Sequence, residues 1–228
     1  FSKSSIFLRW LFFKTGIGAS NQFETLGFLK TDNKQAYPNL QYHFLPLAIK
    51  YDGSAPFRGH GFQFHIGTMR SKSRGFIEII DTNPFSHPKI QFNYLSHPDD
   101  LQDFRNAIKI SRKILRQPPF RKFLDEEINP GSELRTNAQL DNYIRSNVES
   151  AYHPCGSCKM GSEYDLETVV TPDCKVKGTQ NLYCADSSIF PIITNGNLNA
   201  PSIMVGEKAV DHILNKSPLP KDNSIPFL

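Results

Sequence analysis

The sequence predicts an α+β fold with a mixed or antiparallel sheet covered by helices. Segments with strand-like patterns lie in the first half of the chain, whereas helix-like spacing of apolar residues begins near residue 98. With 228 residues and 39% hydrophobic content, the chain is long enough to bury one sizeable core. Strands followed by helices are typical of an α+β layer and not of a doubly wound parallel sheet.

Four strands are predicted in the first half of the chain. Apolar and polar side chains alternate in 40–44 and in 62–66, whereas 76–80 and 90–93 are short runs rich in β-branched and aromatic residues. Alternation along a strand places the apolar side chains on one of its faces. These segments therefore supply the predicted sheet.

Two helices are predicted after the strands. The first begins at Asp99 and Asp100, whose negative charge suits a helix N-terminus, and ends before Pro118. The second begins at Thr136, whose hydroxyl can form a capping box with the side chain of Gln139. Both segments carry apolar side chains at helical spacing, so each is expected to bury one face.

The last third of the chain is rich in turns. Within it, 181–186 is predicted to be a short buried strand, and a helix is predicted from about Pro201 to Leu214, because proline suits a first helical turn. The final residues, 217–228, contain three prolines and are predicted to form a loosely attached tail.

The apolar run Ile6–Phe13 is interrupted by Arg9 and is much shorter than the roughly 20 residues that span a bilayer. Its aromatic residues lie between cationic ones, a pattern also typical of segments at a membrane interface. We favour a helix packed inside a larger protein and keep peripheral membrane contact as the alternative. Because the chain begins at Phe1 without an initiating methionine, we expect it to be a fragment of a longer protein.

Charge and cysteine content narrow the class of protein. Lys and Arg number 26 against 22 Asp and Glu and are scattered along the chain, so no nucleic-acid partner is expected. The sequence has neither a signal-peptide pattern nor a transmembrane stretch. Four cysteines without a secretion signal are typical of reduced thiols in an intracellular protein.

The strongest candidate for chemistry is the segment around His153. Pro154 biases the backbone of His153 toward an extended conformation, so His153 is not expected inside a helix. An imidazole in a loop after a helix can take a hydroxyl proton near neutral pH if it faces a cleft. A lone histidine is more often structural, so this hypothesis needs a second group nearby.

A second polar segment, Asn195–Pro201, lies at the start of the last predicted helix. Asn197 and Asn199 offer carboxamides, and Gly196 lets the backbone approach a flat ligand. The amide groups and partial positive charge of a helix N-terminus would stabilise an electron-accepting ring that becomes anionic on reduction. The alternative is that Asn199 only caps the helix.

Cys155 and Cys158 form a Cys-x-x-Cys pair, for which a zinc site and a redox dithiol are two interpretations. A structural zinc site requires a second close pair, which the spacing of Cys174 and Cys184 does not provide. A redox dithiol normally opens a helix after a strand, but Pro154 precedes this pair. The sequence therefore favours small buried thiols in a turn.

Three segments resemble the C-terminal region of the glucose-methanol-choline (GMC) oxidoreductases in order and spacing. They are His153–Gly161, Asn181–Pro191 and Gly196–Ala209. Other segments are similar to the choline dehydrogenase branch of this family, namely Phe23–Phe28, Pro38–Pro46, Met69–Gly75 and Asn93–Pro98. The resemblance extends over most of the chain.

The resemblance implies part of an FAD-dependent alcohol dehydrogenase that oxidises choline to betaine aldehyde, a step of glycine betaine biosynthesis. No Gly-x-Gly-x-x-Gly fingerprint occurs in the sequence, so the nucleotide-binding half would lie outside it, and the fragment alone would be inactive. The implied organisation is a linking segment, a substrate-binding domain, a catalytic segment whose strand and helix belong to the flavin domain, and a tail. Their bounds are 1–30, 31–150, 151–215 and 216–228.

The resemblance also assigns roles to single residues. The catalytic positions fall on His153 and Asn197. The substrate positions fall on Tyr152, as an aromatic wall for a quaternary ammonium group, and on Glu24, as its counter-charge. The positions that contact the flavin fall on Ala185, Asp186, Asn199 and Pro201, and no metal ligand is implied.

For partners, the resemblance implies a membrane electron acceptor such as a quinone and a peripheral position on the cytoplasmic side of a membrane. Oxygen is the other acceptor that the sequence leaves open. Two other functions also stay open. One is oxidation of a different primary alcohol by the same chemistry, and the other is a non-catalytic binding module stabilised by zinc.

Overall fold

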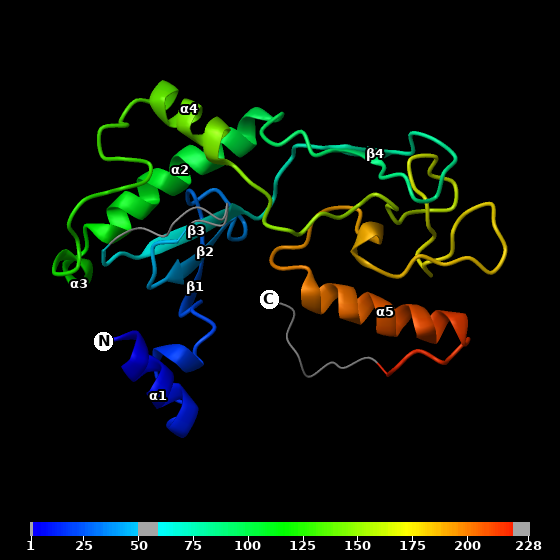
Figure 1. The fold of residues 1–228 in the computed structure, drawn as a ribbon. Coiled ribbons are helices and arrows are strands. Elements are labelled where there is room, and N and C mark those ends of the chain that lie inside the picture. The colour runs from blue at the N-terminus through cyan, green and yellow to red at the C-terminus, as the bar shows by residue number, and fades with distance from the viewer. Residues whose placement is uncertain (1, 50–58, 221–228) are drawn as a thin grey trace. The chain divides into compact units, whose positions relative to one another are not determined.

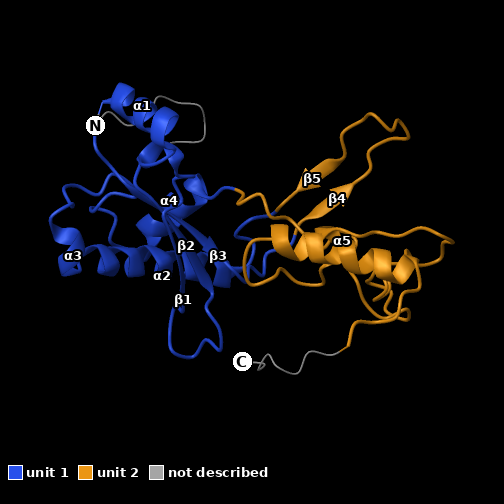
Figure 2. Cartoon of the chain, turned by 90° about the horizontal axis from the view of Figure 1, so that it is seen from below, with its two compact units in different colours: residues 1–74, 93–149 blue, residues 75–92, 150–228 orange. Residues whose placement is uncertain are grey.

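The computed structural model describes residues 2–49 and 59–220, and the chain folds as two compact units (Figure 1; Figure 2). The first unit combines 1–74 with 93–149, and the second combines 75–92 with 150–228. Small antiparallel sheets and helices build these units, which confirms the predicted α+β class. The domain bounds drawn from the sequence stay a prediction.

The first unit contains a three-stranded antiparallel sheet in the order β1, β2, β3 (Figure 1). Its strands are β1 Thr25–Leu29, β2 Leu40–Leu45 and β3 Gln63–Thr68. Strands β2 and β3 confirm two of the predicted segments. The sequence analysis missed β1, an edge strand that contains a glycine and whose side chains are largely exposed, so it lacks the alternation of a half-buried strand.

Helix α2, Pro98–Leu115, packs against this sheet and confirms the first predicted helix. Tyr42 of β2 and Ala107 of α2 are both buried, and the Tyr42 hydroxyl donates a hydrogen bond to the Ala107 carbonyl at 3.0 Å. Apolar residues around this contact form the core between sheet and helix. Burial of a hydrogen-bonded tyrosine therefore fixes where α2 crosses the sheet.

Helix α4, Asn137–Asn147, packs on α2 and confirms the second predicted helix (Figure 1). The predicted capping box is present, because the Thr136 hydroxyl accepts from the Gln139 N–H and the Gln139 side chain accepts from the Thr136 N–H. Leu140 and Ile144 of α4 are buried in a cluster with α2. The short helix α3, Pro118–Arg121, follows α2.

The chain begins with α1, Lys3–Phe13, and a 3-10 turn, η1, Ile17–Ala19. Helix α1 has no buried residue, and the side chains of Phe12 and Phe13 are 70% and 72% exposed. Within the described residues, no helix combines the length and the apolar character that a membrane span requires.

The second unit contains the hairpin of β4 and β5 and the helix α5 (Figure 2). The 3-10 turn η2 also belongs to it. The bounds of β4, β5, η2 and α5 are Phe76–Glu78, Lys89–Gln91, Ser187–Ile189 and Asn199–Ile213. Strands β4 and β5 confirm the other two predicted strands, and α5 confirms the last helix. The core of this unit is the buried cluster of Val170, Cys174, Ile189 and Ala209.

The predicted buried strand at 181–186 is wrong. Asn181 has a left-handed backbone, with φ at 56°, and Leu182 is 51% exposed. Backbone hydrogen bonds from Val176 to Leu182 and from Cys184 to Cys174 hold this segment, but they make only an isolated bridge between Tyr183 and Lys175 and no strand. Of the predicted tail, 216–220 forms no helix or strand, and 221–228 lies outside the described residues.

Candidate active site

His153 and Asn197 meet in the second unit. Nδ2 of Asn197 lies 2.7 Å from Nε2 of His153. A carboxamide NH2 only donates, so this contact requires Nε2 to be an acceptor, as in a neutral imidazole that carries its proton on Nδ1. If the carboxamide turns over, its oxygen instead accepts from a protonated Nε2. The pair therefore places a carboxamide, which can donate or accept, beside Nε2 of the imidazole.

The backbone around His153 is constrained by a local hydrogen bond before it and by a close backbone approach after it. Tyr152, with φ at 59°, donates its N–H to the Ser150 hydroxyl at 2.9 Å. Gly156 has φ at 89°, and a Cβ atom there would lie 3.3 Å from the Phe190 carbonyl oxygen, so a glycine suits this close approach. His153 is accordingly in a loop, as its position before Pro154 predicts.

The segment after His153 is anchored to η2. The N–H of Cys158 donates to the Ser188 carbonyl at 2.9 Å, and the N–H of Met160 donates to the Ile189 carbonyl at 2.8 Å. These two bonds fix the His-Pro segment against the turn that follows Asp186.

Asn197 is positioned by the start of α5. Leu198 is the N-cap residue and is 4% exposed, and its carbonyl accepts from the N–H of Ser202 at 2.9 Å. The alternative in which Asn199 caps the helix is therefore wrong, because Asn199 is already the first helical residue and the helix has no side-chain cap. Pro201 lies in the first turn, as predicted.

Ala185 and Asp186 lie where η2 and α5 come together. The Asp186 carboxylate accepts from the Ser188 N–H at 2.8 Å and caps η2. Hydrogen bonds from the Ser188 hydroxyl and N–H hold the pKa of Asp186 below its ordinary value. The Ala185 carbonyl oxygen faces α5 at Gly206, where a Cβ atom would approach it to 4.0 Å.

The two predicted substrate residues lie in different units. Tyr152 adjoins His153 and is 80% exposed, so its ring is available to a ligand. Glu24 lies in the first unit, where its carboxylate accepts a hydrogen bond from the Ser20 hydroxyl at 2.5 Å. Its role toward a substrate stays a prediction.

Sequence reasoning missed Ser188. Its carbonyl accepts from the N–H of Cys158 and its N–H donates to the Asp186 carboxylate, so it links the His-Pro segment to the residues before α5. The spacing Asp186-x-Ser188 before an apolar residue is the signal of an Asx-type cap that would have indicated it.

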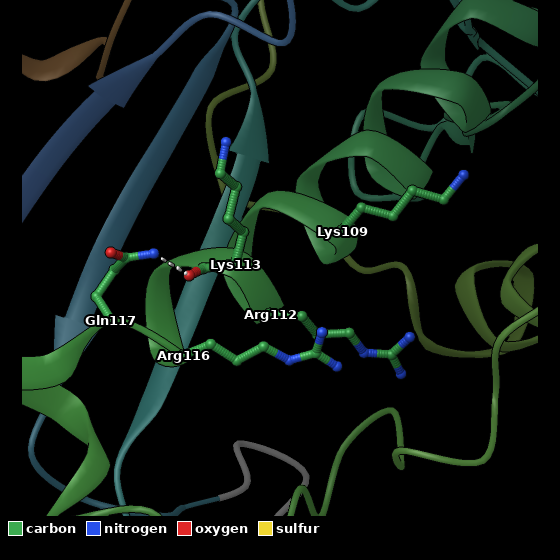
Figure 3. A pocket seen from close by; sticks show the side chains of 5 residues that line it. All are labelled: Lys109, Arg112, Lys113, Arg116 and Gln117. Carbon is green, nitrogen blue, oxygen red and sulfur yellow. Dashed lines mark hydrogen bonds between the residues drawn. The ribbon is translucent and has the colours of Figure 1, made fainter.

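The described residues contain no cluster of three or more His, Cys, Asp or Glu side chains arranged to hold a metal ion. A separate feature of the first unit is a hollow of about 480 Å³ on α2 (Figure 3). Its lining is cationic except for one amide and consists of Lys109, Arg112, Lys113, Arg116 and Gln117. Arg112 is engaged there by the carboxylate of Glu127, so at least part of this charge is compensated.

Comparison with known proteins gives the family. The family model described as GMC oxidoreductase matches residues 71–206. The chain belongs to the GMC oxidoreductase family. The match contains both members of the His153 and Asn197 pair, so the site lies within the part of the chain that defines the family.

Curated GMC relatives match the chain from end to end. The oxygen-dependent choline dehydrogenase of Brucella ovis is 53% identical over 100% of this chain and 42% of its own length. The oxygen-dependent choline dehydrogenase of Vibrio vulnificus is 51% identical over 98% of this chain and 40% of its own length. The chain thus spans about two fifths of the length of these relatives.

Solved GMC structures share the fold. Pyridoxine 4-oxidase from Mesorbium loti has a TM-score of 0.77 at 26% identity, over 86% of this chain and 39% of that one. A formate oxidase has a TM-score of 0.84 at 21% identity, over 94% of this chain and 42% of that one, and supports the fold alone.

Proposed function

We propose that this chain is the substrate-binding and catalytic portion of an FAD-dependent GMC enzyme that oxidises choline to betaine aldehyde. The observation that carries the proposal is the contact of 2.7 Å between Asn197 and His153. It occurs in a chain that is 53% identical to a protein named oxygen-dependent choline dehydrogenase. A proton acceptor beside a hydrogen-bond donor is the arrangement that alcohol oxidation requires.

The chemistry of the groups around α5 fits a flavin. The N–H groups of Asn199 and Ala200 lie in the first turn of α5, where a helix provides no internal acceptors for them. Both residues are exposed. Donors and partial positive charge at this end suit the carbonyl oxygens of an isoalloxazine ring, and Pro201 follows these donors in the chain. Ala185 and Asp186 are proposed as flavin contacts from the family resemblance. Bound FAD would supply the acceptor for the hydride that leaves the substrate carbon.

In the proposed reaction, the substrate hydroxyl binds at the His153 and Asn197 pair. The substrate hydroxyl replaces the Asn197 NH2 as the donor to Nε2 of His153, which then takes the hydroxyl proton, and the Asn197 carboxamide donates to the alkoxide oxygen as negative charge develops there. The contact between the two side chains orients the ring before substrate arrives. Both residues then act on the same oxygen atom of the substrate.

Tyr152 is proposed to recognise the quaternary ammonium group of choline, and the family resemblance alone implies Glu24 as its counter-charge. The exposed ring of Tyr152, next to His153, can offer its π face to a cation, an interaction worth about 0.5–2 kcal/mol. The carboxylate of Glu24 would supply the opposite charge. Recognition of a permanent cation separates choline from an uncharged alcohol.

The electron acceptor is proposed as a membrane quinone, with dioxygen as the rival that the names of the relatives favour. Helix α1 supports a peripheral membrane contact, because its exposed Phe12 and Phe13 lie near the cations of Arg9 and Lys14. The cytoplasmic side is proposed from the family resemblance alone. Measuring oxygen uptake and quinone reduction with choline, in the presence and absence of anionic vesicles, distinguishes the two acceptors.

The proposal is tested by replacing His153 with Gln in the full-length parent. Choline-dependent flavin reduction, followed by stopped-flow absorbance, is expected to slow by about 10²–10⁴-fold while bound FAD is retained. An unchanged rate would falsify the role of His153 as the base. This chain alone, which spans 42% of such a relative, is expected to show no choline oxidation.

A second candidate function keeps the same chemistry and changes the alcohol. One solved neighbour is named pyridoxine 4-oxidase, so the fold also occurs in an enzyme whose name specifies a different alcohol. A substrate panel that includes choline, pyridoxine and simple primary alcohols separates the two. A higher kcat/KM for an uncharged alcohol than for choline would reject the choline assignment.

A further inference from the structure

Cys158 and Cys184 are brought to the same place by Ser188. The N–H of Cys158 donates to the Ser188 carbonyl at 2.9 Å, and Sγ of Cys184 lies 3.1 Å from the Ser188 hydroxyl oxygen. Burial raises the pKa of the Cys184 thiol, and the neighbouring Cys158 thiol adds to this increase. Both cysteines are unpaired thiols in the structure and are half-buried. Both cysteines are therefore held at the same residue, Ser188.

The backbones that carry these thiols are fixed on both sides. The N–H of Cys184 donates to the Cys174 carbonyl at 2.9 Å, and the N–H of Met160, two positions after Cys158, donates to the Ile189 carbonyl at 2.8 Å. Two thiols on well-held segments spend most of their time as neighbours, which favours formation of an intramolecular bond over reaction with an external thiol.

We propose that Cys158 and Cys184 form a reversible disulfide under oxidising conditions, which links the segment after His153 to the segment before Asp186. The sequence analysis considered Cys155 with Cys158 as a redox pair and favoured small buried thiols in a turn instead. The spatial contact through Ser188 selects Cys184 as the partner of Cys158.

The chemistry needs a two-electron oxidant of the peroxide class. Hydrogen peroxide converts the first thiol to a sulfenic acid and releases one water. The second thiol, as its thiolate, attacks that sulfur, an S–S bond forms, and the departing hydroxide leaves as a second water with the thiol proton. Two thiols and one peroxide thus yield one disulfide and two waters. A dithiol reductant such as dithiothreitol reverses the change.

The test uses the full-length parent with bound FAD, reduced, desalted and then treated with hydrogen peroxide. Remaining thiols are alkylated, and the digested protein is mapped by mass spectrometry. We expect two of the four thiols of this chain to escape alkylation and a cross-linked peptide pair to join Cys158 with Cys184. Dithiothreitol should restore alkylation of both. Because peroxide is added directly, the result does not depend on the proposed activity toward choline.

Four serine variants provide matched controls. The cross-link should be lost in Cys158→Ser and Cys184→Ser and kept in Cys155→Ser and Cys174→Ser. A link between Cys155 and Cys158, a link between Cys174 and Cys184, or full alkylation of all four thiols after peroxide treatment would overturn the proposal. The map of the unmodified protein decides the question even if a variant fails to fold.

Discussion

Nε2 of His153 and Nδ2 of Asn197 lie 2.7 Å apart, although 44 positions separate the two residues in the chain. The contact joins the loop that follows α4 to the start of α5. It places an acceptor and a donor side by side within one unit.

Asn197→Ala removes the donor of this pair. In the parent enzyme we expect kcat for choline to fall by about 10²-fold, because one hydrogen bond to a developing oxyanion is lost. Steady-state kinetics with bound FAD quantified in each sample measure the change. Asn106→Ala, which removes a carboxamide on α2 in the first unit, is the control and should leave kcat unchanged. Equal effects of the two variants would contradict the role of Asn197.

Tyr152→Ala tests the cation site. Loss of the ring should raise KM for choline by about 2- to 30-fold, which corresponds to the 0.5–2 kcal/mol of a cation–π contact. Tyr152→Phe keeps the π face and should stay near the parent value. The control substrate is the carbon isostere of choline, in which carbon replaces the quaternary nitrogen. Its KM should change little in Tyr152→Ala. A change as large as that for choline would show that the ring recognises shape and not charge.

Asp100 links the loop before β4 to the first turn of α2. Its buried carboxylate accepts from the hydroxyls of Ser71 and Ser73 and from the N–H groups of Lys72 and Ser73. Burial acts to raise the pKa of Asp100, but these hydrogen bonds outweigh it and leave the pKa below its ordinary value.

The lowered pKa of Asp100 determines how the stability of the protein depends on pH. Because the pKa of Asp100 is lower in the folded state than in the unfolded state, its carboxylate adds stability above about pH 4, and this contribution is lost as the pH falls through the folded pKa. Asp100→Asn should therefore lower the free energy of unfolding by about 1–3 kcal/mol at neutral pH, with a smaller difference at acidic pH. Urea titrations of the parent at both pH values measure this. Asp99→Asn, at the exposed neighbouring carboxylate, should have a smaller effect, and the same effect would contradict the prediction.

Arg112 holds the segment between α3 and α4. Its guanidinium donates to both carboxylate oxygens of Glu127 at 2.7–3.0 Å and to the carbonyls of Gly131 and Leu134 at 2.8 Å. A lysine keeps the positive charge but cannot donate the several hydrogen bonds of the planar guanidinium fork. Arg112→Lys should therefore lower the free energy of unfolding by about 1–3 kcal/mol. Lys113→Arg, on the same helix, is the matched control and should be neutral. If the urea midpoints of both variants equal that of the parent, the fork has no net stabilising effect.

Elements whose sequence patterns involve only neighbouring residues could be predicted from the sequence. Alternation located β2 and β3, and the Thr136 and Gln139 pair located the start of α4 because a capping box needs only residues of one turn. The exposed edge strand β1 carries no such alternation and was missed. The apolar run at 181–186 resembled a strand, but turns at both of its ends leave it only the bridge at Tyr183.

The candidate site was predicted in part. His153 and Asn197 were singled out by their chemistry and by family resemblance, and the structure brings them into contact. The roles of Ser188 and Cys184 depend on contacts with Cys158 across some 30 positions of irregular chain, and residue patterns carry no information about such contacts. The structure was needed to find them.

The second unit is made from two stretches of chain, 75–92 and 150–228, with part of the first unit between them. The polypeptide must therefore pass from one unit to the other at three junctions, near residues 74, 92 and 149. No single proteolytic cut can separate the two units, and neither can be produced as one uninterrupted gene segment. Transplanting the His153 unit into another flavoenzyme would require the hairpin of β4 and β5 to be grafted together with the C-terminal portion.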